Sequence, residues 1–123
     1  MNALVVDDSR VIRTVLSRIL VDLGFKVQEA ANGREAIESL DRTGSPDVVF
    51  VDWNMPVMNG LEFVTTVRGD AKRAGLPLVM VTSESEMDSI AKALEVGVSE
   101  YIMKPFDREI VRDKLNMLGI SVG

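Results

Sequence analysis

Acidic residues directly follow two apolar runs of the sequence, which is an unusual way for a buried strand to end. The run Leu4–Val6 leads into Asp7 and Asp8, and the run Val48–Val51 leads into Asp52. If these runs are neighbouring parallel strands, the three carboxylates meet, and like charges about 4 Å apart repel by roughly 4 kcal/mol at an effective dielectric constant near 20. Such a cluster favours a cation, and oxygen ligands that share it with a phosphate are typical of Mg²⁺. The pattern therefore indicates metal-assisted phosphate chemistry.

A hydroxyl and an amine follow two further apolar runs. Thr82 follows the run Leu78–Val81, and Lys104 follows the run Glu100–Met103. A positioned ammonium group offsets the charge of phosphate and carboxylates, and phosphoryl transfer needs mainly positioning and charge neutralisation. An ionised carboxylate is itself a nucleophile, so the reaction requires no histidine in this chain. Taken singly, each of these side chains has an ordinary structural interpretation, such as a helix cap for the Asp pair.

Apolar runs alternate with amphipathic stretches along the chain, which predicts the elements that hold these side chains. The predicted strands are Ala3–Val6, Phe25–Glu29, Val48–Val51, Leu78–Val81 and Glu100–Met103. Alternating strands and helices predict an α/β fold, with one parallel sheet covered on both faces and right-handed crossovers. In such open sheets, ligands bind beyond the carboxyl ends of the strands, where the polar residues fall.

Capping residues and apolar spacing predict five helices between and after the strands. Gly24 ends the first helix, Asn32 and Asp107 are the expected N-caps of the second and fifth, and the third helix follows Asn59-Gly60. Ser85 and Asp88 have the spacing of a capping box and predict where the fourth helix begins. In that helix, the apolar spacing of Met87, Ile90 and Leu94 predicts one buried face, with Ile90 and Leu94 directed toward the core.

Composition narrows the class of protein. The chain has 123 residues, which fits one domain, and it contains neither cysteine nor histidine, so disulfides and the usual zinc sites are excluded. A formal net charge of −5 argues against direct nucleic-acid binding. No apolar run approaches the roughly 20 residues of a transmembrane helix, and no signal peptide is evident. A soluble, cytoplasmic protein is expected.

The set of strand-end residues, with its spacing, resembles the receiver domain of two-component response regulators over essentially the whole chain. The similarity is greatest to the single-domain chemotaxis regulators of the CheY type, through the segments Asp52-Trp53-Asn54-Met55-Pro56 and Lys104-Pro105-Phe106. The resemblance implies a receiver domain over residues 1–123. It also implies a flavodoxin-like, doubly wound sheet of five parallel strands in the order 2-1-3-4-5, with five helices.

The resemblance assigns roles to individual residues. Asp52 would be the phosphoacceptor, and a partner histidine kinase would be the donor. Mg²⁺ would be bound by Asp8, Asp52 and the carbonyl of Asn54, with Asp7 acting mostly through a water. Thr82 and Lys104 would contact phosphoryl oxygens, and such a domain would catalyse only its own phosphorylation and dephosphorylation. Tyr101 would be the switching aromatic residue. Asn54 and Glu84 would tune the rate of dephosphorylation, and the Lys104–Pro105 peptide bond would be cis.

The same resemblance predicts an output surface and partners. The surface would comprise the fourth helix, the fifth strand and the fifth helix, with Lys92, Glu95, Glu100 and Lys114 exposed on it. Its target would be a protein such as the flagellar switch, in chemotaxis or motility. A monomer that neither binds nucleic acid nor inserts into a membrane is expected.

Three alternatives remain at this point. A flavin-binding electron carrier shares the topology, but it would need a Ser/Thr/Gly-rich phosphate loop where this chain has Asp7-Asp8-Ser9-Arg10. A haloacid-dehalogenase-like phosphatase would carry an Asp-x-Asp motif at its first strand and a cap domain. The third alternative is a receiver cut from a larger regulator with a DNA-binding or enzymatic output domain, although both ends of the chain fit a stand-alone protein.

Overall fold

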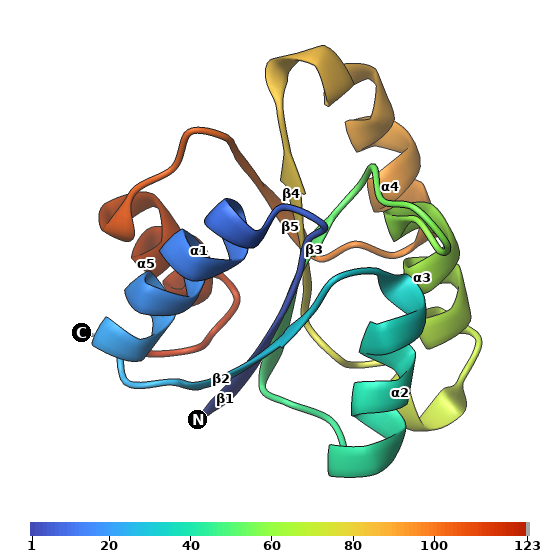
Figure 1. Cartoon of the computed structure of the whole chain (residues 1–123), viewed down its shortest axis with the longest axis horizontal. Coiled ribbons are helices and arrows are strands. Elements are labelled where there is room, and N and C mark those ends of the chain that lie inside the picture. Colours follow the sequence, from blue (N-terminus) through green and yellow to red (C-terminus); the bar gives the residue numbers. More distant parts are fainter. Residues whose placement is uncertain (123) are drawn as a thin grey trace.

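Five parallel strands form one sheet in the order β2-β1-β3-β4-β5, with helices on both of its faces (Figure 1). The computed structural model describes residues 1–122, apart from the side chain of Glu84. The strands are β1 (Asn2–Val6), β2 (Lys26–Ala30), β3 (Val48–Asp52), β4 (Leu78–Thr82) and β5 (Glu100–Met103). The helices are α1 (Arg10–Asp22), α2 (Gly33–Thr43), α3 (Gly60–Arg68), α4 (Ile90–Val96) and α5 (Arg108–Met117), with short 3₁₀ helices η1 (Ala71–Arg73) and η2 (Glu84–Ser89). The predicted flavodoxin-like fold is confirmed.

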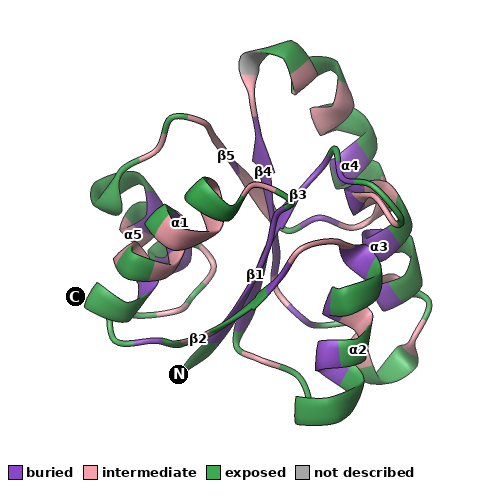
Figure 2. Ribbon diagram, in the orientation of Figure 1, coloured by how far each residue is buried: buried purple, intermediate pink, exposed green. Residues whose placement is uncertain are grey.

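Two hydrophobic clusters lie on opposite faces of the sheet. Helices α1 and α5 cover one face, and α2, α3 and α4 cover the other (Figure 1). The central strands β3 and β4 are buried along their whole length (Figure 2), because helices cover them on both faces. This explains why their sequences are apolar without alternation.

Two predicted N-caps, Asn32 and Asp107, are confirmed, and the helix expected after Asn59-Gly60 has Asn59 as its N-cap. The side chains of Asn32, Asn59 and Asp107 accept hydrogen bonds from the backbone N–H groups of the first turns of α2, α3 and α5. In α3 the capping box is complete, since Glu62 accepts a hydrogen bond from the Asn59 N–H. These caps set where each helix begins and therefore how the preceding loop leaves the sheet.

The predicted beginning of the fourth helix is wrong. After β4 the chain enters the 3₁₀ helix η2, with Ser83 at its N-cap, and α-helical geometry begins only at Ile90. Leu94, which we expected in the core, is 47% exposed, and Met87 is 50% exposed. The buried residue of α4 is Ala93, because the change from 3₁₀ to α geometry rotates the helix so that Leu94 turns away from the sheet.

None of the helices in the described part of the chain has the length and apolar character required to cross a bilayer.

Candidate functional site

Three carboxylates meet at the carboxyl edge of the sheet. Asp7 and Asp8 follow β1, and Asp52 ends β3, which pairs directly with β1. One carboxylate oxygen from each residue lies within 4.8 Å of those of the other two. Asp7 and Asp52 are only 2% and 4% exposed, whereas Asp8 lies at the surface. The predicted acidic cluster therefore forms, and Asp8 is its solvent-facing member.

Lys104 provides the positive charge of the cluster. Its Nζ atom lies 3.2 Å from Asp7 Oδ2 and 3.5 Å from Asp52 Oδ1. The residue directly follows β5, and its peptide bond to Pro105 is cis. One ammonium group thus faces two buried carboxylates, which leaves an excess of negative charge at the site.

The polar contacts of Asp7 and Asp52 leave carboxylate oxygens available to a cation. Asp7 Oδ1 accepts a hydrogen bond from the Ser9 N–H at 2.8 Å, and Asp52 Oδ1 accepts one from the Trp53 N–H at 2.9 Å. Asp7 Oδ2 is buried, and among the described residues it has no partner with hydrogen-bond geometry, although Lys104 lies at ion-pair distance. An unsatisfied carboxylate oxygen within a group of three carboxylates is a donor set that suits Mg²⁺.

Burial and charge shift the proton equilibria of this site. Burial, followed by the charge of Asp7, raises the pKa of Asp52 to about 7, and Lys104 offsets part of this effect. Glu86 and Asp8 raise the pKa of Asp52 further. Burial alone would lower the pKa of Lys104, but the carboxylates of Asp52 and Asp7 outweigh it and raise that pKa. Lys104 therefore remains a cation, while Asp52 in the metal-free protein ionises near neutral pH.

Two further predicted residues lie around the cluster. Thr82 is the last residue of β4 and is fully buried, and the pairing of Asp52 with Val81 places Thr82 one position beyond Asp52 on the neighbouring strand. Its hydroxyl donates a hydrogen bond to the Ser83 carbonyl at 3.3 Å. Asn54 is exposed in the loop that follows β3. Both residues are therefore at the same edge of the sheet as the carboxylates.

The loop after β3 is pressed against the strand end that carries Asp52. The Gly60 N–H donates to the Trp53 carbonyl at 3.0 Å. A Cβ atom at Gly60 would lie 2.6 Å from the Asp52 carbonyl oxygen and 2.7 Å from Trp53 Cε3. Only a glycine permits this close approach, which holds the Asn54 segment beside the acidic cluster.

Tyr101, the predicted switching residue, is not part of the cluster. Tyr101 lies on β5, where it pairs with Met80, and its half-buried ring has Lys114 Nζ 5.0 Å from its centroid. The prediction for the Glu84 side chain lies outside the described residues. The sequence analysis missed Glu86, whose charge acts on Asp52. Its spacing from Ser83, three residues along the chain, matches a capping box and could have drawn attention to it.

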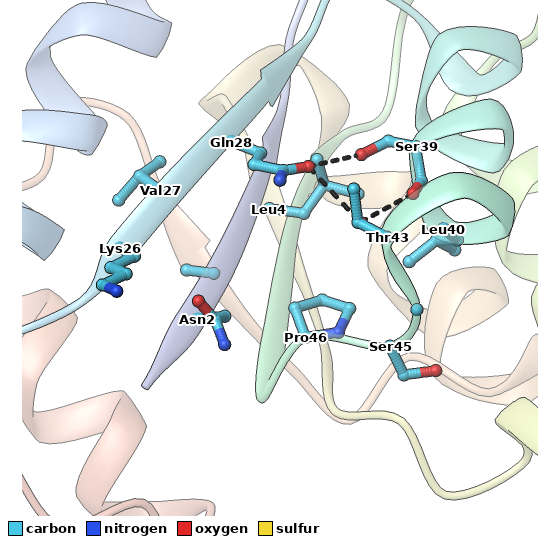
Figure 3. A pocket seen from close by; sticks show the side chains of 12 residues that line it. Asn2, Leu4, Lys26, Val27, Gln28, Ser39, Leu40, Thr43, Ser45 and Pro46 are labelled. Carbon is cyan, nitrogen blue, oxygen red and sulfur yellow. Dashed lines mark hydrogen bonds between the residues drawn. The ribbon is translucent and has the colours of Figure 1, made fainter.

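A separate cavity of about 300 Å³ lies at the opposite edge of the sheet. It is lined by the beginnings of β1 and β2 and by the end of α2 (Figure 3). The Ser39 hydroxyl donates to Gln28 Oε1 at 2.8 Å, and the Thr43 hydroxyl donates to the Ser39 carbonyl at 2.8 Å. None of the predicted site residues lines this cavity, so it has no part in the chemistry of the acidic edge.

Known proteins with similar sequences and structures share this arrangement of elements. A family model described as the response regulator receiver domain matches residues 3–116. Chemotaxis protein CheY1 of Helicobacter pylori is 41% identical over 119 residues, which cover 96% of each chain. A CheY homolog of Campylobacter jejuni is 42% identical and covers 100% of this chain and 96% of its own. The solved structure of the chemotaxis response regulator CheY4 of Vibrio cholerae is 37% identical, with a TM-score of 0.86 over 95% of this chain and 97% of its own.

Proposed function

Because this chain belongs to the response regulator receiver family, we propose that it accepts a phosphoryl group on Asp52 from a histidine kinase and signals through a change in partner binding. The observation that carries the proposal is the meeting of Asp7, Asp8 and Asp52 with Lys104 at one edge of the sheet. The named relatives are chemotaxis proteins, and we propose a chemotaxis role for this chain as well.

Each side chain of the site would have a separate role in the phosphoryl transfer. A carboxylate oxygen of Asp52 forms the new bond to phosphorus as the bond to the donor histidine nitrogen breaks, and the imidazole leaves with the bonding electron pair. Lys104, already 3.5 Å from Asp52, is placed to balance the charge of the phosphoryl oxygens, and the Thr82 hydroxyl can donate to one of them. Such a protein is a signalling module and turns over no external substrate.

Asp8, Asp52 and the Asn54 carbonyl would hold Mg²⁺, with Asp7 acting through a water. When bound, the ion would supply positive charge that offsets the phosphoryl oxygens and the carboxylates. Asp8 suits this role because it is the solvent-facing member of the cluster, where an ion enters. Asn54 and Glu84 are proposed to tune dephosphorylation, since they follow Asp52 and Thr82 by two residues at the rim of the site.

Phosphorylation should require a divalent cation. We expect the protein incubated with acetyl phosphate and Mg²⁺ to gain the mass of one phosphoryl group, and EDTA to prevent the gain, since one ammonium group cannot neutralise three carboxylates and a phosphate. Intact mass spectrometry measures the product, and Trp53, which directly follows Asp52, reports metal binding by fluorescence. Equal phosphorylation with and without EDTA would contradict the metal assignment.

The output surface is proposed to comprise α4, β5 and α5. Lys92 and Glu95 are exposed on α4, as predicted, but Glu100 and Lys114 are half-buried because Lys114 Nζ pairs with Glu100 Oε1 at 3.0 Å. This ion pair joins β5 to α5 beside the ring of Tyr101. A movement of Thr82 toward the phosphoryl group would vacate space that the Tyr101 ring can fill, which gives the face two packing states.

Replacing Tyr101 should uncouple this face from the phosphorylation site. We expect beryllofluoride, a phosphate mimic, to shift backbone amide resonances throughout residues 82–106 of the native protein. In Tyr101→Ala the shifts should be confined to the vicinity of Asp52, Thr82 and Lys104, because the ring that links the two packing states is absent. Tyr101→Phe keeps the ring and should preserve the native pattern. If the alanine variant also shows the native pattern of shifts, the conformational change does not depend on Tyr101 and reaches partners through another face.

A further inference from the structure

A fourth acidic side chain is held at the carboxyl end of β4, the strand that pairs with the strand ending in Asp52. The Glu86 N–H donates to the Ser83 carbonyl at 2.9 Å, which closes a turn of η2. The Ser83 hydroxyl donates to Glu86 Oε1 at 3.1 Å and lies 2.9 Å from the Ser85 hydroxyl. Ser83 directly follows Thr82, and Figure 1 shows this segment continuing beyond the carboxyl end of β4. The Glu86 side chain is thereby folded back toward the strand end.

The position of Glu86 is not explained by its own hydrogen bonds. Glu86 Oε2 is buried, and among the described residues it has no hydrogen-bond partner. Removing a carboxylate oxygen from water without a compensating donor is unfavourable. Ser83 and Glu86 also have capping-box spacing, yet the Ser83 side chain makes no cap hydrogen bond to the helix backbone and instead bonds the Glu86 side chain.

The charge of Glu86 acts on the phosphoacceptor. Glu86 is bonded to Ser83, which directly follows Thr82, and Thr82 lies one position beyond Asp52 on the neighbouring strand. The negative charge of Glu86 also raises the pKa of Asp52. An acidic group near the reacting carboxylate opposes any further negative charge there. Both the incoming phosphoryl donor and the phosphorylated product bring such charge, since aspartyl phosphate carries about −2 where the carboxylate carried −1.

We propose that Glu86 is an inhibitory carboxylate: held by Ser83, it slows phosphorylation of Asp52 by anionic donors and is repelled from the site once the phosphoryl group is attached. The inference rests on the proposed function and adds a residue that sets the rate of the same reaction. Glu86 is a positioning residue and not a catalytic one, because it acts through charge and takes part in no bond change. Its effect should depend on the ionic strength, since the anionic donor approaches through solvent, where salt screens the repulsion.

The test compares Glu86→Gln with the native protein at saturating Mg²⁺, with acetyl phosphate as the donor. Glutamine keeps the length of the side chain and an oxygen that can accept from Ser83, so it removes the charge with little change of shape. We expect phosphorylation at low salt to be about three- to tenfold faster, as one unit charge in a partly wet site allows. The difference should shrink near 0.5 M salt, where the screening length is only a few Å.

The control is Glu38→Gln, which removes the same charge from an exposed position on α2 and should leave the rate unchanged. Ser83→Ala frees the Glu86 side chain and should also accelerate the reaction. Equal rates and equal salt dependence of Glu86→Gln and Glu38→Gln would overturn the inference, as would a Ser83→Ala variant as slow as the native protein. If even the native protein gains no phosphate, it is the proposed function that fails.

Discussion

Asp52→Asn is expected to abolish phosphorylation completely. In the native protein one phosphoryl group should be gained from acetyl phosphate, whereas the variant should keep its unmodified mass at every incubation time. The amide has no carboxylate oxygen to form the bond to phosphorus, and the neighbouring acids cannot replace it. Asp7 is buried, with one oxygen bonded to the Ser9 N–H and the other at ion-pair distance from Lys104. Asp8 is exposed and lacks the burial and the Lys104 contact of Asp52.

A matched control separates loss of the nucleophile from loss of the fold. Asp41→Asn makes the same substitution on α2, where the side chain is exposed and pairs with Arg73 at 2.7 Å, and it should accept phosphate at the native rate. Far-ultraviolet circular dichroism should show the same helix content in all three proteins. If Asp52→Asn gained the full mass of a phosphoryl group, a residue other than Asp52 would be the phosphoacceptor.

Much of the fold could be predicted because its signals are local. Capping side chains such as Asn32 and Asp107 act within one turn, so their sequence pattern and their structural effect coincide. The carboxyl-edge convergence of Asp7 and Asp52 also follows once β1 and β3 are taken as neighbours. The strand order itself came from the family resemblance, and the membership of the chain in that family is confirmed.

Two of the wrong predictions, the beginning of the fourth helix and the burial of Leu94, concern the segment from β4 to α4, where a local pattern has more than one structural outcome. The capping-box spacing of Ser85 and Asp88 predicted a helix beginning there, but the chain forms a 3₁₀ helix. A change of helix type rotates all later residues, so Leu94 moved from the expected core to the surface. The same segment bonds Glu86 to Ser83 at the edge of the sheet that carries Asp52, and no periodicity reveals a contact that depends on the path of a loop.

The unequal burial of the three aspartates could also not be predicted from the sequence. Asp7 and Asp8 are adjacent and chemically identical, yet one is buried and the other exposed, because β1 ends at Val6 and Asp8 lies farther along the loop that leaves the sheet. The cost of charge in this cluster therefore lies mainly in Asp52, whose pKa is raised by burial and by the charge of Asp7. This asymmetry decides which substitution should change the stability of the metal-free protein most.

Asp52→Asn should also stabilise the metal-free protein, and the gain should grow with pH. The pKa of Asp52 is about 7 in the folded protein, against an ordinary value of 3.8. Below about pH 4 Asp52 is protonated in both the folded and the unfolded chain, so its ionisation does not lower the free energy of unfolding. As the pH rises toward 7, the unfolded chain ionises while the folded site retains its proton, and the stability that this protonated group contributes is lost. The full difference is on the order of 2–4 kcal/mol.

Urea unfolding in EDTA at pH 4.5, 6 and 8 measures this effect. The variant and the native protein should differ little at pH 4.5, and the variant should be the more stable by the largest margin at pH 8. Asp8→Asn should gain less, because Asp8 is exposed and is the smallest of the charges that raise the pKa of Asp52. Adding Mg²⁺ at pH 8 should stabilise the native protein more than Asp52→Asn, since the ion removes the same repulsion that the substitution removes. A margin that does not change with pH would contradict the raised pKa of Asp52, because it would mean that Lys104 offsets both the burial of this carboxylate and the charge of Asp7.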